Sequence, residues 1–203
     1  FSHELIHAWT RTQVELRHIG ITSQQAAAFQ HLGRYLVYPD THLRADPETV
    51  RKGLKSQSAL WPMAISGDHP IFALRINDDM DMDIAREAMS ALEYLRRRGV
   101  VADLAIINER ATSYAQDMQH ALDHLAENLK HRLPPGRPHV FTVRDDLMDE
   151  GATLSLLAAA RVVLHTRNGK IVDQINRAVS LFAAPRAIES DSDWTGLPPA
   201  LPA

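Results

Sequence analysis

Short apolar runs alternate with amphipathic helical patterns from residue 71 to residue 182, and this alternation most constrains the fold. The runs are bounded by turn-forming residues, as buried strands are. The segments between them carry apolar residues three and four positions apart, which is typical of helices that cover a sheet. The strands predicted in this way are 71–76, 101–107, 139–143 and 161–164, and the helices are about 81–98, 112–131, 150–160 and 170–182. The pattern therefore predicts an α/β fold: a small, mostly parallel sheet of about four strands with flanking helices.

Residues 1–70 contain helical patterns but no strand pattern, and we expect them to form a helical N-terminal arm and a connecting loop. The α/β domain is then predicted to span residues 71–184. Residues 185–203 are rich in Ser, Asp and Pro without periodicity, which indicates a flexible tail. The chain opens Phe-Ser-His-Glu-Leu without an initiator Met, so we expect it to be a piece of a longer protein.

Composition excludes several classes of protein. The chain has 203 residues, of which 45% are hydrophobic and 23% are charged, so a wholly disordered chain is excluded. The net charge of −3 argues against a general nucleic-acid binder. No apolar run approaches the roughly 18 residues of a membrane-spanning helix, and direct membrane insertion is not expected. The absence of Cys removes disulfide frameworks, thiolate metal sites and cysteine nucleophiles.

Polar residues follow the predicted strands. Asn77 and Asp78 follow the first strand, Asn108 and Glu109 the second, and Arg144 the third. Ligands of open α/β sheets bind beyond the carboxyl ends of the strands, so these side chains could grip sugar hydroxyls or a metal ion. The same residue types are also selected by turns and helix N-caps, and we favour that ordinary interpretation. No glycine-rich phosphate loop occurs, and the EF-hand spacing is not met, so we predict neither a cofactor nor a metal.

The loop before the first strand offers a weaker catalytic candidate. Ser66, Asp68 and His69 are the residue types of a hydrolytic triad, but neighbours in one loop seldom point at one another. Asp68 and Glu109 would be the carboxylate pair if the chain were a glycan-processing enzyme, because glycosidases need two carboxyl groups roughly 5–10 Å apart. Trp61, like Trp9, could stack on a sugar, although core packing is the interpretation we favour for both.

Several ordered stretches resemble one family, the cyclic β-1,2-glucan synthases. They are WTRTQVELRH (9–18), YPD (38–40), QSALW (57–61), ISGDHPI (65–71), DLAIINE (103–109), SYAQDMQ (113–119) and AARVVL (159–164). The resemblance covers about residues 5–180. It implies a segment of a very large bacterial inner-membrane glycosyltransferase, lying on the cytoplasmic side, in the C-terminal part related to glycoside phosphorylases. Residues 61–64 read Trp-Pro-Met-Ala, where the family more often has a Gly before Ile-Ser-Gly-Asp.

The resemblance implies that the catalytic residues of such a synthase lie in other regions, so no catalytic residue is assigned in this chain. We predict a non-catalytic α/β segment that positions modules or binds glucan, with neighbouring domains of the parent chain and β-glucan as its partners. The alternatives are an active glycan-processing domain and a pure protein-interaction module. The candidate ligand-binding residues are Asp68, Asn77, Asp78, Asn108, Glu109, Arg144 and Trp61.

Overall fold

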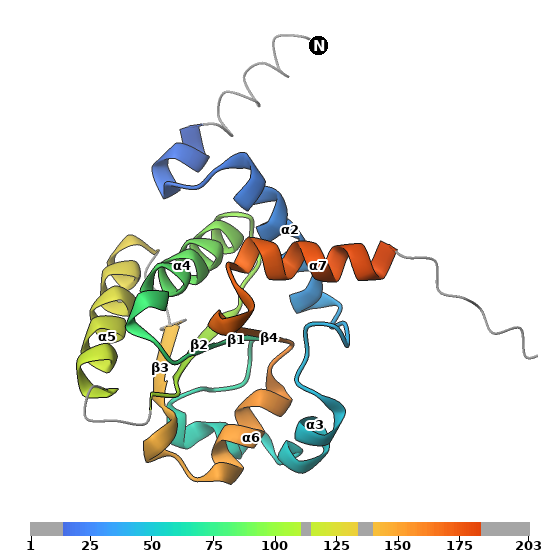
Figure 1. The fold of residues 1–203 in the computed structure, drawn as a ribbon, viewed down its shortest axis with the longest axis vertical. Coiled ribbons are helices and arrows are strands. Elements are labelled where there is room, and N and C mark those ends of the chain that lie inside the picture. Colours follow the sequence, from blue (N-terminus) through green and yellow to red (C-terminus); the bar gives the residue numbers. More distant parts are fainter. Residues whose placement is uncertain (1–13, 111–114, 134–139, 184–203) are drawn as a thin grey trace, which may run out of the picture.

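The computed structural model describes residues 14–110, 115–133 and 140–183 and contains one four-stranded parallel sheet. The strands are β1 (Ile71–Ile76), β2 (Asp103–Asn108), β3 (Val140–Arg144) and β4 (Val162–His165), in the order β3-β2-β1-β4 (Figure 1). In the central strand, Ala73 is in register with Ala105 of β2 and Val163 of β4. The predicted α/β class with a small parallel sheet is confirmed.

Four helices cover one face of the sheet: α2 (Ser23–Val37), α4 (Met82–Arg97), α5 (Ala115–Arg132) and α7 (Ile171–Ala183) (Figure 1). A capping box between Thr22 and Gln25 starts α2, because it satisfies backbone N–H groups that have no partner within the helix. Phe29 and Leu32 of α2 are fully buried in one core with Phe72 of β1. This first face is therefore filled by large side chains.

The opposite face carries α3 (Pro47–Gly53), a 3-10 helix (Gln57–Met63) and α6 (Glu150–Ala159). Its core is smaller and includes Ala73 and Ala105 from the sheet and Leu156 from α6. At Gly53 the two α-helices touch closely, since a Cβ there would overlap the Leu154 carbonyl and lie 2.8 Å from the Ala158 Cβ. The 3-10 segment lies within residues 1–70, for which the sequence predicted a helical arm and a connecting loop. Pro62 within this segment lacks an N–H and disfavours a regular α-helix.

The described part of residues 1–70 is built into this core. Helix α2 packs against α4 and α7, and Arg161 Nη1 donates to the Val37 carbonyl at 3.0 Å. The following segment covers the outer edge of β4, where the Val163 N–H donates to the Leu43 carbonyl at 2.6 Å. The predicted tail 185–203 and Trp9 lie outside the described residues. None of the described helices is both long and apolar enough to cross a membrane.

Candidate functional site

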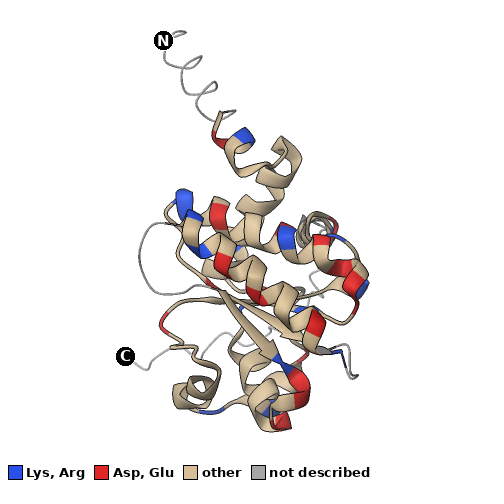
Figure 2. Cartoon of the chain, turned by 90° about the vertical axis from the view of Figure 1, so that its left-hand side faces the viewer, with Lys and Arg blue, Asp and Glu red and all other residues tan. Residues whose placement is uncertain are grey.

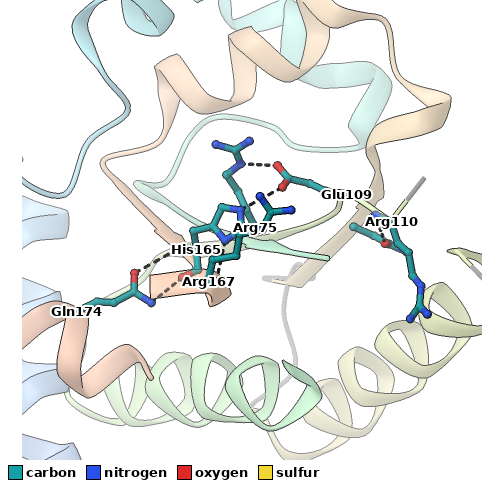
Figure 3. A network of polar contacts seen from close by, with 7 residues as sticks. Arg75, Glu109, Arg110, His165, Arg167 and Gln174 are labelled. Atoms are coloured by element: carbon teal, nitrogen blue, oxygen red, sulfur yellow. Dashed lines mark hydrogen bonds and ion pairs between the residues drawn. The ribbon is translucent and has the colours of Figure 1, made fainter. Parts of the chain in front are cut away.

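Arg75, Glu109 and His165 meet at the carboxyl ends of three neighbouring strands (Figure 3). Arg75 of β1 is in register with His165 of β4, and Glu109 directly follows β2. Side chains alternate between the faces of a strand, so all three share the α6 face with Ala73, Ala105 and Val163. Arg75 Nε donates to Glu109 Oε1, and His165 Nε2 lies 3.3 Å from Glu109 Oε2.

The charge state of this cluster follows from its hydrogen bonds. The Arg167 backbone N–H donates to His165 Nδ1 at 3.0 Å, so the proton of the neutral ring sits on Nε2 and faces Glu109. Burial lowers the pKa of His165 below its ordinary value of 6.5; the Glu109 carboxylate opposes this shift, and Arg75 and Arg167 add to it. The cluster therefore consists of one guanidinium, one carboxylate and a neutral imidazole at neutral pH.

Helix α7 and the loop after β4 hold His165 in place. Gln174 Nε2 donates to the carbonyls of His165 and Gly169 at 2.9 and 2.7 Å, and its Oε1 accepts from the His165 N–H at 3.3 Å. Beside them, Asn77 Oδ1 accepts from the Arg167 guanidinium in the amide orientation that satisfies both groups. The loops after β1 and β4 are therefore tied together at this edge.

The other predicted strand-end residues serve turns and ion pairs. Asn108 is buried, where its Nδ2 donates to Gln119 Oε1 at 3.3 Å and its Oδ1 accepts from the Arg110 N–H at 3.1 Å. Asp78 accepts from the Met80 N–H at 2.9 Å and caps a short turn. Arg144 Nε donates to Asp146 at 2.9 Å; this hydrogen bond raises the pKa of Arg144 and lowers that of Asp146. Turn chemistry thus accounts for the contacts of Asp78 and Arg144.

Asp68 and Trp61 lie away from this edge. Asp68 precedes β1, whereas Glu109 follows β2, so the two carboxyl groups are at opposite ends of strands about 20 Å long. The carboxylate pair proposed for a glycan-processing enzyme is therefore wrong, because it requires a separation of roughly 5–10 Å. Trp61 is 64% exposed on the 3-10 helix, so the favoured interpretation of core packing is also wrong for this residue.

No family model matches the chain. Over 185 residues, or 90% of its length, the chain is 65% identical to the cyclic β-(1,2)-glucan synthase NdvB of Rhizobium meliloti (strain 1021). The resemblance to the cyclic β-1,2-glucan synthase family is confirmed. The matched stretch is 6% of the length of NdvB, so the chain is similar to one small segment of that synthase.

Sequence reasoning missed three residues of the site in this synthase-like segment: Arg75, His165 and Arg167. Arg75 carries a signal, since it is the only charged residue within the apolar strand Ile71–Ile76. His165 ends the fourth strand and is one position beyond the predicted range of 161–164. Arg75 and His165 lie side by side because β4 pairs with β1, and periodicity in the sequence does not reveal this strand order.

The cluster offers groups that suit a polyol. The Arg75 side chain is 37% exposed and contacts Glu109 through Nε, while its two Nη groups point away from Glu109 (Figure 3). Glu109 and His165 are less exposed, at 14% and 16%, and form the floor beneath it. In the three described ranges, no group of three or more His, Asp or Glu side chains could hold a metal ion. Figure 2 shows acidic and basic residues interspersed rather than gathered into a surface of one sign.

Proposed function

We propose that the chain is a non-catalytic α/β segment of a large cyclic β-1,2-glucan synthase-like protein, and that it binds glucan at the carboxyl edge of its sheet. The observation that carries the proposal is the 65% identity to a segment of NdvB. The family resemblance further suggests the C-terminal, phosphorylase-related part of a bacterial inner-membrane enzyme, on its cytoplasmic side. The activity of the whole synthase then belongs to other regions.

Glucan binding is supported by the arrangement around Arg75. Sugar hydroxyls bind well to planar guanidinium groups, which present several N–H donors in fixed directions. The Glu109 carboxylate orients this guanidinium through Nε, and less entropy is lost when a ligand meets a donor that is already fixed. At the same edge, Asn77 accepts from the Arg167 guanidinium through Oδ1, and its amide nitrogen can donate to a ligand.

A non-catalytic role is supported by the contacts of Glu109. Glycoside hydrolysis needs one carboxyl group that donates a proton and a second one across the bond. Glu109 lies between the Arg75 guanidinium and the Nε2–H of His165, so each of its two oxygens already has a partner within the chain. Asp79 and Asp146 at the same edge are paired with Arg110 and Arg144.

Isothermal titration of the 203-residue chain with β-1,2-linked glucooligosaccharides tests the binding, with cello-oligosaccharides as the linkage control. We expect heat of binding for the β-1,2-linked sugar, and silence at millimolar sugar would overturn glucan binding. The variant Arg75→Gln should weaken binding roughly tenfold, as the loss of a charged hydrogen bond does. Arg51→Gln is the matched control, because Arg51 forms a similar pair with Glu48 on α3, outside the site.

A second function, positioning of neighbouring modules, is favoured by a different observation. Tyr38 and Val37 at the end of α2 are 73% and 51% exposed. Neither residue contributes to the carboxyl-edge cluster. If titration shows no glucan binding, and the surface around Val37 and Tyr38 still contacts a neighbouring module, positioning remains as the function of the segment.

A further inference from the structure

A groove of about 300 Å³ runs between α2 and the end of α4, apart from the carboxyl-edge site. Tyr94, Leu95 and Val100 line it from one side, and Val37 and Tyr38 from the other. Gly33 also lines it, and a Cβ at this position would lie 2.8 Å from the Leu95 side chain. The groove thus exists where two helices approach closely and one of them lacks a side chain.

Exposed apolar residues lie at the groove and at the end of α7, on either side of Arg34. Val37 and Tyr38 stand at its rim, and Leu181 and Phe182 at the end of α7 are 58% and 52% exposed. The two ends are joined by Arg34, whose guanidinium carbon lies 4.3 Å from the centre of the Phe182 ring. An apolar groove with exposed aromatic and aliphatic side chains beside it is typical of an interaction site.

The chemistry of the groove fits a polypeptide better than a sugar. A sugar needs hydrogen-bond partners for its hydroxyls, but the Tyr94 hydroxyl at the groove already accepts from Gln30 Nε2 at 2.9 Å. Apart from Gln30 and the guanidinium groups of Arg34 and Arg98 at the rim, the side chains that line the groove are aliphatic or aromatic. An aromatic or large aliphatic side chain would fill such a groove and be removed from water.

The rim of the groove is cationic. Arg34 and Arg98 are held over the rings of Phe182 and Tyr94, at 4.3 and 5.3 Å. Arg98 also faces Glu15 at 3.5 Å. Arg34 has no such carboxylate among its contacts in the described residues, so its charge favours an acidic group on an incoming segment.

We propose that this groove seats another region of the same parent polypeptide, through a bulky apolar side chain flanked by a carboxylate that pairs with Arg34. The inference rests on the part of the proposed function that makes the chain one segment of a much larger protein. The match to 6% of NdvB supports it, because a protein of that size has most of its polypeptide outside this segment. It does not depend on glucan binding.

Hydroxyl-radical footprinting of the isolated 203-residue chain and of the full-length parent synthase tests the proposal. Tyr38 should react rapidly in the isolated chain and about threefold or more slowly in the parent, since the core of an interface excludes water. Tyr35, which is 2% exposed in the isolated chain, serves as the reference of low reactivity. Equal labelling of Tyr38 in the two proteins would overturn the proposal.

Variants of the parent protein test the charge. Arg34→Glu should restore much of the labelling of Tyr38, whereas Arg51→Glu on α3 should leave it unchanged. If Arg34→Glu leaves the labelling of Tyr38 in the parent protein unchanged, the proposed carboxylate partner of Arg34 is wrong. Protection of Tyr38 in the isolated chain that grows with concentration would assign the groove to a second copy and would also overturn the proposal. Titration with glucan at the Arg75 site reports separately on the proposed function.

Discussion

The two faces of the sheet are packed in different ways. On the first face, α2, α4, α5 and α7 fill the space with large side chains such as Phe29 and Leu92. On the second face, α3 meets α6 almost backbone to backbone at Gly53. A layer of interlocking side chains loses free energy when atoms are removed, whereas a backbone contact loses it when atoms are added. The same sheet is therefore sensitive to opposite kinds of substitution on its two sides.

Removal of a large side chain from the first face should have the largest effect. Phe29 is fully buried, with its ring centre 6.1 Å from that of Tyr94. We expect Phe29→Ala to lower the free energy of unfolding by about 3–5 kcal/mol, measured by urea denaturation followed by circular dichroism. Val14→Ala, at a site that is 61% exposed, should cost less than about 0.5 kcal/mol. Similar losses of unfolding free energy for Phe29→Ala and Val14→Ala would contradict a core that depends on α2.

Addition of one methyl group distinguishes the faces directly. Gly53→Ala should cost about 1–3 kcal/mol, because the new Cβ overlaps the rigid Leu154 carbonyl. Gly33→Ala on the first face should cost less than about 1 kcal/mol, since the nearest atom is the mobile end of Leu95 and Ala favours a helix. Thermal unfolding of both variants measures the difference. An equal loss of unfolding free energy in the two variants would mean that the neighbouring atoms move aside to the same extent on both faces.

A buried carboxylate on the first face anchors one helix to another. Glu87 of α4 accepts from the backbone N–H groups of Ile171 and Val172 at 3.0 and 3.4 Å, at the start of α7. We expect Glu87→Gln to lower the free energy of unfolding by about 1 kcal/mol, because a charged acceptor at a helix N-terminus is lost. Glu150→Gln in the exposed first turn of α6 is the control and should cost a few tenths of a kcal/mol.

The smallest expected effect is on pH dependence. The pKa of His165 is lower in the folded chain than in the unfolded chain, so the unfolded chain binds more protons between the two values. The contribution of neutral His165 to stability is therefore complete above a pH of about 6.5 and is lost as the pH falls through the folded pKa. Urea midpoints measured from about pH 7.5 down to about pH 5 should fall less steeply in His165→Gln than in the unaltered chain. An unchanged slope would show that His165 titrates alike in both states.

Most elements could be predicted because each is specified locally. The apolar run 71–76 and the helical spacing after it need no knowledge of distant residues, and both were placed within a residue or two. The 3-10 helix Gln57–Met63 was missed, since its tight turns lack a helical period. The burial of α2 could not be predicted either, because an amphipathic pattern shows that a helix has an apolar side but not which neighbour covers it.

The candidate site was predicted only in part. Glu109 could be found because it follows a strand, and the strand ends of a parallel sheet share one edge. Its partners Arg75 and His165 depend on β4 lying next to β1, about 90 residues away along the chain, a matter of topology. Asp68 was paired wrongly with Glu109, because residue types suited to the chemistry were considered without the direction of the strands.

The packing of α2 against α7 has a consequence for synthesis of the chain. The two helices begin at Ser23 and Ile171, so the earlier one leaves the ribosome long before its partner. Chains grow at roughly 5–20 residues per second, so the part of α2 that packs on α7 stays uncovered for about 7 to 30 s. During that interval this part of α2 is accessible to chaperones, and a pause in translation before α7 would prolong its exposure.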